Sequence, residues 1–408
     1  MSHRSVLSSI STLMAAPMPA SLPACAVPCM SQALNLTACA VSNLTCLCQD
    51  DTYIRVLRSC VRKSCDLEYS YIAKNVTWTL CGFPYKSQTG TVAGRFTLII
   101  GPAFFVLMRL LAKALRLSSW GADDVMLIIG YFFSLSFSIS RFYGHQLGIG
   151  RDVWALSSEQ ITRFMHVFFA YEILYTLSIS TIKASFLFFY IRVFHMVSNT
   201  FTLVLWTTQA FNIAFCIAFM IANLAQCRPF SNAWKAWDGK HPGHCINVYA
   251  MFVSHAAINI ALHVWVLILP TTQVLWLNMR KRQKVEIMFM FGLGAFITAV
   301  SAIRLRVLVT LEGFRDPTYD AFYLHMWSCI ELSVAVVVAC LPSARQLWRH
   351  LTPKFLRSIG LGSPAYQSQE RREDYIRRLK NILSMDTGQE KPTPMGGNDL
   401  ASYLKQSS

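Results

Sequence analysis

Long apolar segments alternate with short polar stretches over most of the chain. Each apolar segment holds about 20 residues, the length that an α-helix needs to cross roughly 30 Å of hydrocarbon. The segments lie at residues 94–114, 123–143, 165–190, 201–222, 249–276, 286–309 and 326–344. This pattern predicts an all-α, polytopic membrane protein in which residues 94–344 form a seven-transmembrane helix bundle.

Residues 21–85 break this pattern because they are rich in cysteine and contain no long apolar run. They hold eight of the 13 cysteines of the chain, namely Cys25, Cys29, Cys39, Cys46, Cys48, Cys60, Cys65 and Cys81. A segment this short buries little apolar surface, so we expect disulfides to stabilise it. Eight cysteines can pair in about a hundred ways, and the sequence leaves their pairing open.

The cysteine-rich segment also carries three N-x-Thr sequons, which begin at Asn35, Asn43 and Asn75. Glycosylation and disulfide formation both indicate the secretory pathway, so we expect this segment to face the cell exterior. Residues 1–20 are typical of a signal peptide, and residues 86–93 would link the segment to the first span.

Two further cysteines, Cys227 and Cys245, lie between the fourth and fifth apolar segments. With the N-terminal segment outside, this connection faces the same oxidising compartment, and we expect the two residues to form a disulfide.

Basic residues gather in the connections that would then face the cytoplasm. The residues that we assign to an effector-facing surface are Arg192, Arg280, Lys281, Arg282 and Lys284. By the positive-inside rule, the chain is predicted to be a multi-pass plasma-membrane protein with an extracellular N-terminus and a cytoplasmic C-terminus. Residues 345–408 would form a basic, disordered tail. The net charge of +16 then reflects topology and contact with membrane lipids, and not a nucleic-acid partner.

Burying a polar or charged side chain within an apolar span is energetically unfavourable unless the side chain has a partner. Such residues therefore indicate a polar network inside the bundle. The candidates are Glu172, Lys183, Asn259, His263, Arg304 and Glu331. One hypothesis is that neutral His263 accepts a hydrogen bond from Lys183. The alternative, a hydrogen bond from His263 to a backbone carbonyl between helices, is the one that we favour. Glu172, His166 and His255 lie near the exterior half of the bundle and are candidates to line a ligand cavity, although packing or loop solvation explains each of them equally well. Arg304 and Glu331 are expected at one depth, where they would pair. Asp123 and Asp124 would cap the second span at its N-terminal end.

The chain resembles two fungal families. The cysteine-rich segment, with Pro23-Ala24-Cys25 and Cys46-Leu47-Cys48, resembles the CFEM extracellular domain. The membrane region resembles the fungal rhodopsin-like (PTH11-like) seven-transmembrane receptor family. The matching residues are Asp123-Asp124, Gly148-Ile149-Gly150, Lys183, Tyr190-Ile191-Arg192, Cys227-Arg228-Pro229, Trp234, Cys245, Asn259, Leu269-Pro270, Arg304, Trp327, Glu331 and Leu341-Pro342.

These resemblances imply a helical, disulfide-rich ectodomain on a fungal cell-surface receptor similar to G-protein-coupled receptors. Such a receptor would sense an extracellular or host-surface cue through an unknown ligand. It would signal to a heterotrimeric G protein, in some members in pathogenesis.

Some CFEM domains bind ferric haem through an Asp three residues before the fourth cysteine. This chain has Asn43 at that position, and a neutral amide is a poor ligand for ferric iron. We therefore expect no cofactor.

Two other classes of function stay open. One is a membrane carrier or a haem or iron-uptake component, and the other is an accessory integral membrane protein of a secondary-metabolite gene cluster. We expect no enzymatic activity and no metal site, because the sequence contains no nucleophile elbow, P-loop, dinucleotide fingerprint or H-E-x-x-H motif.

Overall fold

The structure, a computed structural model, describes residues 22–88, 92–194, 199–276, 281–310 and 316–358. It divides into two units, residues 1–345 and 346–408. The expected signal peptide at residues 1–20 and most of the expected tail lie outside the described residues. The first unit contains a small helical N-terminal domain and a helix bundle.

The N-terminal domain consists of five short helices. They are η1 (Ala24–Ala26), α2 (Val27–Leu34), α3 (Leu44–Gln49), α4 (Asp51–Ser64) and α5 (Leu67–Cys81). Polar side chains cap the N-termini of α3 and α4. Asn43 Oδ1 accepts a hydrogen bond from Cys46 N at 3.1 Å, and Asp50 Oδ1 accepts one from Thr52 N at 2.8 Å. Gly82, with φ 62°, ends α5 in the left-handed conformation that favours glycine.

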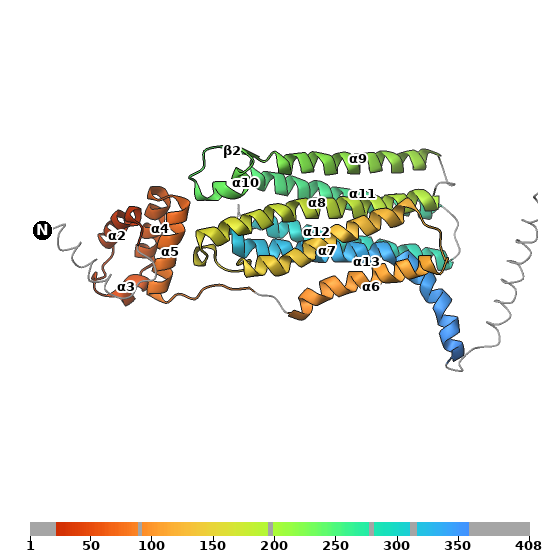
Figure 1. Ribbon diagram of the computed structural model, residues 1–408, viewed down its shortest axis with the longest axis horizontal. Helices are drawn as coiled ribbons and strands as arrows, with labels where there is room; N and C mark the ends of the chain where they lie inside the picture. Colours follow the sequence, from red (N-terminus) through yellow and green to blue (C-terminus); the bar gives the residue numbers. More distant parts are fainter. Residues whose placement is uncertain (1–21, 89–91, 195–198, 277–280, 311–315, 359–408) are drawn as a thin grey trace, which may run out of the picture. The chain divides into compact units, whose positions relative to one another are not determined.

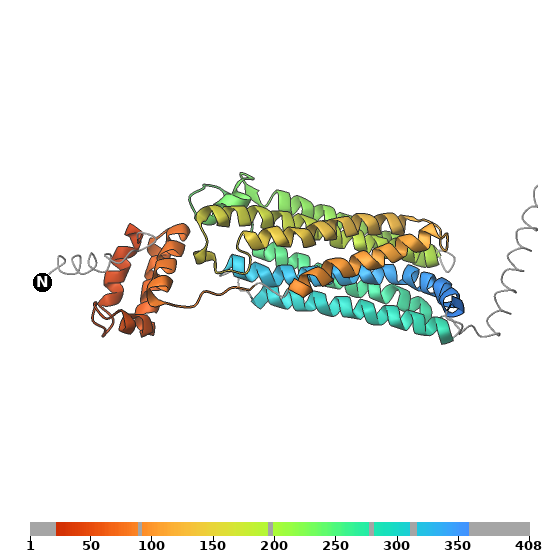
Figure 2. The same ribbon diagram turned by 60° about the horizontal axis from the view of Figure 1, so that its bottom comes forward.

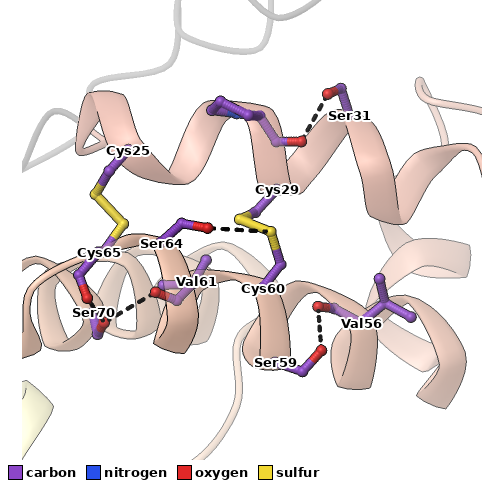
Figure 3. The surroundings of a disulfide bond; sticks show 11 residues. Cys25, Cys29, Ser31, Val56, Ser59, Cys60, Val61, Ser64, Cys65 and Ser70 are labelled. Carbon is purple, nitrogen blue, oxygen red and sulfur yellow. Dashed lines mark hydrogen bonds between the residues drawn. A yellow bond between two sulfur atoms is a disulfide. The ribbon is translucent and has the colours of Figure 1, made fainter.

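Four disulfides hold these helices together. They join Cys25 to Cys65, Cys29 to Cys60, Cys39 to Cys46 and Cys48 to Cys81. Figure 3 shows the first two linking the η1–α2 segment to α4, which lies alongside it. Ala26, Ala33, Leu57 and Val61 pack between these elements in a small apolar core. The core is small because the domain is small, so covalent links carry much of its stability.

The bundle has seven helices long and apolar enough to cross a membrane, as the hydrophobic pattern predicts. They are α6 (Val92–Ala114), α7 (Ala122–Gln146), α8 (Ser158–Phe194), α9 (Asn199–Leu224), α11 (Val248–Trp276), α12 (Lys281–Thr310) and α13 (Pro317–Ser358). The helices run side by side along the bundle (Figure 1), and the turned view in Figure 2 shows the same arrangement. Fold class and the number of predicted spans are therefore confirmed.

The helices differ in how much of their surface is buried by other helices. In the most apolar stretch of α13, 67% of residues are buried, and in α8 50% are buried, against 28% in α6, α9 and α12. Large apolar side chains such as Phe132 and Leu203 face outward, as expected for contact with lipid. Helices α8 and α13 therefore form the centre of the bundle.

At one end of the bundle, short segments of structure connect α7 to α8 and α9 to α11. We call this end the loop end. Between α9 and α11 the segments include β1 (Cys227–Arg228), α10 (Asn232–Lys235), η3 (Ala236–Asp238) and β2 (His244–Cys245). The two strands pair antiparallel, and a disulfide joins Cys227 to Cys245 within them. Between α7 and α8, Gly150 has φ 85°, and a Cβ there would come within 2.2 Å of Gln88 O. Glycine is therefore required at this position by both conformation and space.

Two carboxyl groups hold the α7–α8 connection in place, Asp316 at the start of α13 and Asp152 through the segment that precedes α6. Asp316 Oδ1 accepts from Val153 N at 3.0 Å, and Asp152 Oδ2 accepts from Lys86 N at 2.8 Å. Burial, backed by the neighbouring Asp152 carboxylate, raises the pKa of Asp316 from 3.8 to about 6. Ionisation of Asp316 is thus less favourable in the folded protein than in the unfolded chain.

This raised pKa predicts a specific dependence of stability on pH. Between about pH 4 and pH 6 the folded protein binds more protons at Asp316 than the unfolded chain does, so stability falls as pH rises. We expect Asp316→Asn, which keeps an oxygen acceptor, to reduce that fall and to leave stability at pH 7 unchanged or higher. Thermal unfolding from pH 4.5 to pH 7.5, with exposed Asp66→Asn as control, tests this. Equal pH profiles for wild type and Asp316→Asn would contradict it.

The disulfides of the N-terminal domain should differ in how much they contribute to the free energy of unfolding. Removing the Cys29–Cys60 disulfide, which spans 31 residues, should lower the free energy of unfolding by about 4 kcal/mol. A disulfide that closes a longer loop removes more conformational entropy from the unfolded chain, and therefore it stabilises the folded state more. Removing Cys39–Cys46, which spans 7 residues, should cost about 2 kcal/mol. Limited proteolysis of the paired Cys→Ala variants in increasing urea measures both. A larger loss from the short link would refute this ranking.

Candidate functional site

The centre of the bundle holds a buried polar network around Glu331 of α13, whose exposed fraction is 0%. Glu331 accepts hydrogen bonds from Tyr175 OH at 2.9 Å, from Asn259 Nδ2 at 3.0 Å and from Ser301 Oγ. Arg304 Nη1 lies 3.7 Å from Glu331 Oε2 and donates to Tyr175 OH at 2.6 Å. The sequence predicted an Arg304–Glu331 pair, and the structure places the two groups together with Tyr175 between them.

Lys183 of α8 joins this network through an amide. Its Nζ donates to the side-chain oxygen of Asn259 and to the Asn259 carbonyl at 3.2 Å. The hypothesis of a hydrogen bond from Lys183 to His263 is therefore wrong, because the lysine donates to Asn259, which lies one helical turn earlier on α11. His263 Nε2 instead lies 3.4 Å from Glu331 Oε1. Asn259 thus links Lys183 to Glu331, the carboxylate that balances buried positive charge here.

A cavity of about 60 Å³ borders the network on the side of the loop end. Tyr175 and Arg304 belong to both the network and the cavity wall. The cavity is lined by Phe137, Phe168, Tyr171, Glu172, Tyr175, Thr176, Phe219, Asn223, Met251, Phe252, His255, Arg304, Leu308, Leu324, His325 and Ser328. A mainly aromatic wall with a few polar groups is the usual composition of a small-molecule site.

Four of the lining residues have a buried polar atom with no hydrogen-bond partner in the described part of the chain. These atoms are Glu172 Oε2, His255 Nε2, Arg304 Nε and His325 Nδ1. Buried polar groups in folded proteins are nearly always hydrogen-bonded, so such a cluster calls for an explanation. Of these four residues, sequence reasoning placed only Glu172 and Arg304 in the network. His255, like Glu172, is a sequence-based candidate for a cavity wall, and both line this cavity. His325 was missed as a site residue, although a histidine within an apolar span is itself a signal.

A second polar centre lies at the opposite end of the bundle, around Asp123 and Asp124. Arg109 Nη2 lies 2.5 Å from Asp123 Oδ2, and Arg109 Nε donates to Asp124 Oδ1 at 2.8 Å. Lys113 Nζ lies 2.7 Å from Asp124 Oδ2, and Arg192 Nη1 lies 3.1 Å from Asp123 Oδ1. We call these five residues the ion-pair cluster. Both carboxylates are 2% exposed, so the cluster is a structural joint of α6, α7 and α8.

The ion-pair cluster adds to the expected role of the aspartates. Asp124 Oδ2 does accept from Gly121 N at 2.9 Å, as a residue at a helix start would. The capping prediction nevertheless omitted Arg109 and Lys113, which stand four residues apart on the preceding helix. Arg109 also donates to the Ala339 carbonyl of α13 at 2.5 Å, which ties a fourth helix to the cluster.

The residues predicted to face an effector are only partly described. Arg192, besides contacting Asp123, donates to the Ser119 carbonyl at 2.6 Å, so it also has a structural role. Arg280 lies outside the described residues. Lys281, Arg282 and Lys284 belong to α12, but their side chains lie outside the described residues.

Two of the three sequon asparagines, Asn35 and Asn43, are exposed. Asn75 differs because it lies inside α5 and its Oδ1 accepts from Tyr85 OH at 2.7 Å.

In the N-terminal domain, the position at which some CFEM domains carry the aspartate that binds ferric haem is occupied by Asn43. Asn43 uses its side-chain oxygen to cap α3, and the nearby Asp50 carboxylate accepts from Thr37 Oγ1 and Thr52 N. These hydrogen bonds lower the pKa of Asp50 and hold it at the start of α4. The residues at the position where some CFEM domains bind iron therefore do not fit haem ligation. Within the described residues no group of three or more His, Cys, Asp or Glu is placed to hold a metal ion.

The central network predicts a large effect for one substitution. Glu331→Gln should lower the free energy of unfolding by about 3 to 5 kcal/mol, because it leaves the charges of Arg304 and Lys183 buried without a carboxylate to balance them. Tyr175→Phe, which removes only the bridging hydroxyl, should cost about 1 to 2 kcal/mol. Thermal unfolding in nanodiscs measures both. In a double-mutant cycle, Arg304→Gln should be less harmful in the Glu331→Gln background, and strict additivity would disprove the coupling.

Comparison with known proteins identifies two domains. Residues 108–350 match the fungal rhodopsin domain, and residues 18–82 match the CFEM domain. A SAT4 family membrane protein from Emericella nidulans is 30% identical over 54% of this chain and 55% of its own length. Receptor GIN3 from Arthrobotrys oligospora is 25% identical over 64% of this chain and 65% of its own length.

A third relative is the Satratoxin biosynthesis SC1 cluster protein 4 from Stachybotrys chartarum, 26% identical over 53% of this chain and 75% of its own length. The chain thus spans little more than half the length of the Emericella relative. No solved structure matches the chain. Because the fungal rhodopsin domain covers more than half of the sequence, the chain belongs to the fungal rhodopsin domain family, as a receptor-like multi-pass membrane protein with an N-terminal CFEM domain.

Proposed function

We propose that the protein is a non-enzymatic plasma-membrane receptor that binds an extracellular or host-surface cue and signals to a heterotrimeric G protein. The N-terminal domain lies outside the cell in this proposal, and the C-terminus lies in the cytoplasm. One observation supports it above the others, namely that the same two helices contribute to the cavity and to the opposite end of the bundle. The similarity to a protein named as a receptor points the same way.

Helix α8 carries residues at successive levels of the bundle. Glu172 and Tyr175 line the cavity, Lys183 lies in the central network, and Arg192 joins the ion-pair cluster. A small shift or rotation of α8 at the cavity would therefore change the contacts of Arg192 with Asp123. Helical elements with two discrete packing arrangements are the usual carriers of such coupling.

Helix α13 offers a second connection between the same levels. His325 lines the cavity, Glu331 is the centre of the network, and the Ala339 carbonyl accepts from Arg109 in the ion-pair cluster. A ligand in the cavity contacts both helices, so it can favour one arrangement of α8 against α13. The ion-pair cluster would then hold the resting arrangement.

The proposed orientation rests on chemistry at the two ends. Five disulfides lie in the N-terminal domain and at the loop end, and disulfides persist in oxidising compartments. Lys281, Arg282 and Lys284 lie in the first turn of α12, at the opposite end of the bundle, which the positive-inside rule assigns to the cytoplasm.

A second candidate function is an accessory role in secondary metabolism. It is favoured by the similarity to a protein named for a satratoxin biosynthesis cluster. In that role the cavity would bind a metabolite that the same cluster makes, and the neighbouring genes in the genome would include biosynthetic enzymes.

The receptor proposal predicts that weakening the ion-pair cluster raises signalling without a ligand. Asp123→Asn removes the charge that holds Arg109 and Arg192, and it should increase basal output about fivefold or more, a typical allosteric coupling. A proximity-labelling enzyme fused to the C-terminus in living cells measures recovery of a Gα subunit. Asp238→Asn, a loop residue remote from the cluster, is the control.

The same fusion tests the orientation and the class of function. Failure to recover any Gα from wild type and Asp123→Asn would refute coupling to a G protein. Protease treatment of intact cells should remove the N-terminal domain and spare the fused C-terminus, and the opposite pattern would refute the orientation. Measurable solute flux in proteoliposomes without Gα labelling would replace the receptor by a carrier.

A further inference from the structure

An acidic pair lies at the loop end, where the chain enters the two central helices of the bundle. Asp152 immediately precedes η2 (Val153–Ala155), which leads into α8, and Asp316 immediately precedes α13. The side chains of the two aspartates lie within hydrogen-bonding reach of each other. A change in the separation of these carboxyl groups therefore acts directly on the starts of α8 and α13.

Asp152 brings an unsatisfied acceptor to this pair. Its Oδ2 accepts from Lys86 N at 2.8 Å, but its Oδ1 is buried and has no hydrogen-bond donor within the described part of the chain. Asp152 is only 1% exposed, so its surface offers bulk water almost no access. An ionised carboxylate can only accept hydrogen bonds, whereas a protonated carboxyl group can also donate one. One proton held between Asp152 and Asp316 therefore supplies the donor that Asp152 Oδ1 lacks.

Asp316 keeps its place through three donors that are independent of this proton. Its Oδ1 accepts from Val153 N at 3.0 Å, from Thr318 Oγ1 at 3.2 Å and from Tyr319 N at 3.4 Å. The residue is partly exposed, so its carboxyl group can exchange protons with water at this end of the bundle. Asp316 is thus both fixed in position and open to titration.

The two carboxyl groups resist simultaneous ionisation because like charges at this distance repel each other. Burial raises the pKa of Asp316 to about 6, and the neighbouring Asp152 carboxylate adds to the increase. A pair of this kind holds one shared proton below the pH at which it titrates and loses that proton above it.

The N-terminal domain presents two titratable groups to the pair, and neither replaces the proton. Lys74 of α5 attracts both aspartates through space, but its ammonium group lies over the rings of Trp154 and Trp78, 2.9 Å and 5.0 Å from their centroids. Burial lowers the pKa of Lys74 to about 8, so the environment disfavours its charge. Burial also raises the pKa of Tyr71, which faces Asp316, to about 12, and this phenol stays neutral.

The remaining charged neighbours belong to the bundle and to the segment that precedes α6. Lys86 gives Asp152 its backbone N–H, whereas its ammonium group lies 5.6 Å from the centroid of the Tyr319 ring. Asp320 brings a further carboxyl group, whose Oδ2 accepts from Asp316 N at 3.3 Å. The bundle side of the pair therefore adds negative charge close by, which favours retention of the shared proton.

We propose that Asp152 and Asp316 form a proton-binding site, through which the pH outside the cell sets the arrangement of α8 against α13. This deepens the proposed receptor function and rests on it for the consequence inside the cell, whereas proton binding itself is a property of the purified protein. The arrangement that keeps the carboxyl groups together binds the shared proton more tightly, so protonation stabilises it. Loss of the proton leaves two carboxylates that repel each other and favours wider separation of the helix starts. The protonated pair thus holds the resting arrangement, and signalling increases as the pair ionises.

Infrared difference spectroscopy of the full chain in nanodiscs tests the proton site. The C=O stretch of a protonated carboxyl group differs in frequency from the stretches of a carboxylate, so difference spectra between pH values report protonation directly. We expect a protonated-carboxyl band with a midpoint near pH 6 in wild type and its loss in Asp316→Asn. Glu159→Gln, which alters an exposed carboxyl group in the first turn of α8, is the matched control and should keep the band. No such band in wild type, or an unchanged band in Asp316→Asn, would overturn the site.

Asp152→Asn separates a coupled pair from the burial of Asp316 alone. The substitution keeps an oxygen acceptor for Lys86 N, removes the like charge and supplies an amide donor for ionised Asp316. The midpoint of the remaining Asp316 band should therefore fall by about one pH unit. An unchanged midpoint would show that Asp316 titrates on its own and would overturn the shared site.

The consequence for signalling is measured with the Gα proximity label in living cells held at external pH 5 and pH 7.5. Wild type should give at least about fivefold more Gα recovery at pH 7.5, a typical allosteric coupling. Asp316→Asn, which mimics the protonated pair, should stay at the low level at both pH values. Glu159→Gln should follow wild type, which controls for effects of external pH on the cell. Equal pH dependence in wild type and Asp316→Asn would overturn the switch.

The outcome for proton binding is distinguishable from the outcome for the receptor function. A pair that titrates in nanodiscs, with no Gα recovered at either pH, would uphold the proton site and refute signalling to a G protein. Gα recovery that does not change with external pH would uphold the receptor function and refute control by the acidic pair.

Discussion

The structure depends on the burial of one carboxylate, that of Glu331, among groups that stabilise its charge. A carboxylate inside an apolar bundle is highly unfavourable unless cations and hydrogen-bond donors surround it. Arg304, Tyr175, Asn259 and Ser301 supply these contacts from three other helices. Removing any one of these partners leaves another buried group unsatisfied, so α8, α11, α12 and α13 are held in a single relative arrangement.

The cavity and the ion-pair cluster extend this constraint to the two ends of the bundle. At the cavity, Arg304 keeps one nitrogen without a partner in the described residues, while the rest of its guanidinium serves the network. At the opposite end, Arg109 contacts α7 and α13 at once. The bundle thus combines a central network that fixes helix positions with two polar centres that share α8 and α13. Such a division suits a protein that responds to a ligand without losing its fold.

The N-terminal domain is stabilised by a different principle. Its apolar core is small, and four disulfides connect its helices, so its shape persists without contact with lipid. The oxygen atoms of Asn43 and Asp50 are used at the starts of helices, where they accept from backbone amides. At the position where some CFEM domains bind iron, the polar side chains of this domain are thus committed to hydrogen bonds within the protein.

The sequence by itself determined the helical class, the seven spans and the cysteine-rich domain, because these follow from residue type and spacing along one segment at a time. It also pointed to Glu331 and Arg304, since charges within apolar spans need partners. Only the tertiary structure decided which partners meet. Lys183 contacts Asn259 and not His263 because helix rotation and depth, which spacing does not encode, set the geometry. The disulfide pairing, the ion-pair cluster and the cavity were decided in the same way, by packing among helices distant in sequence.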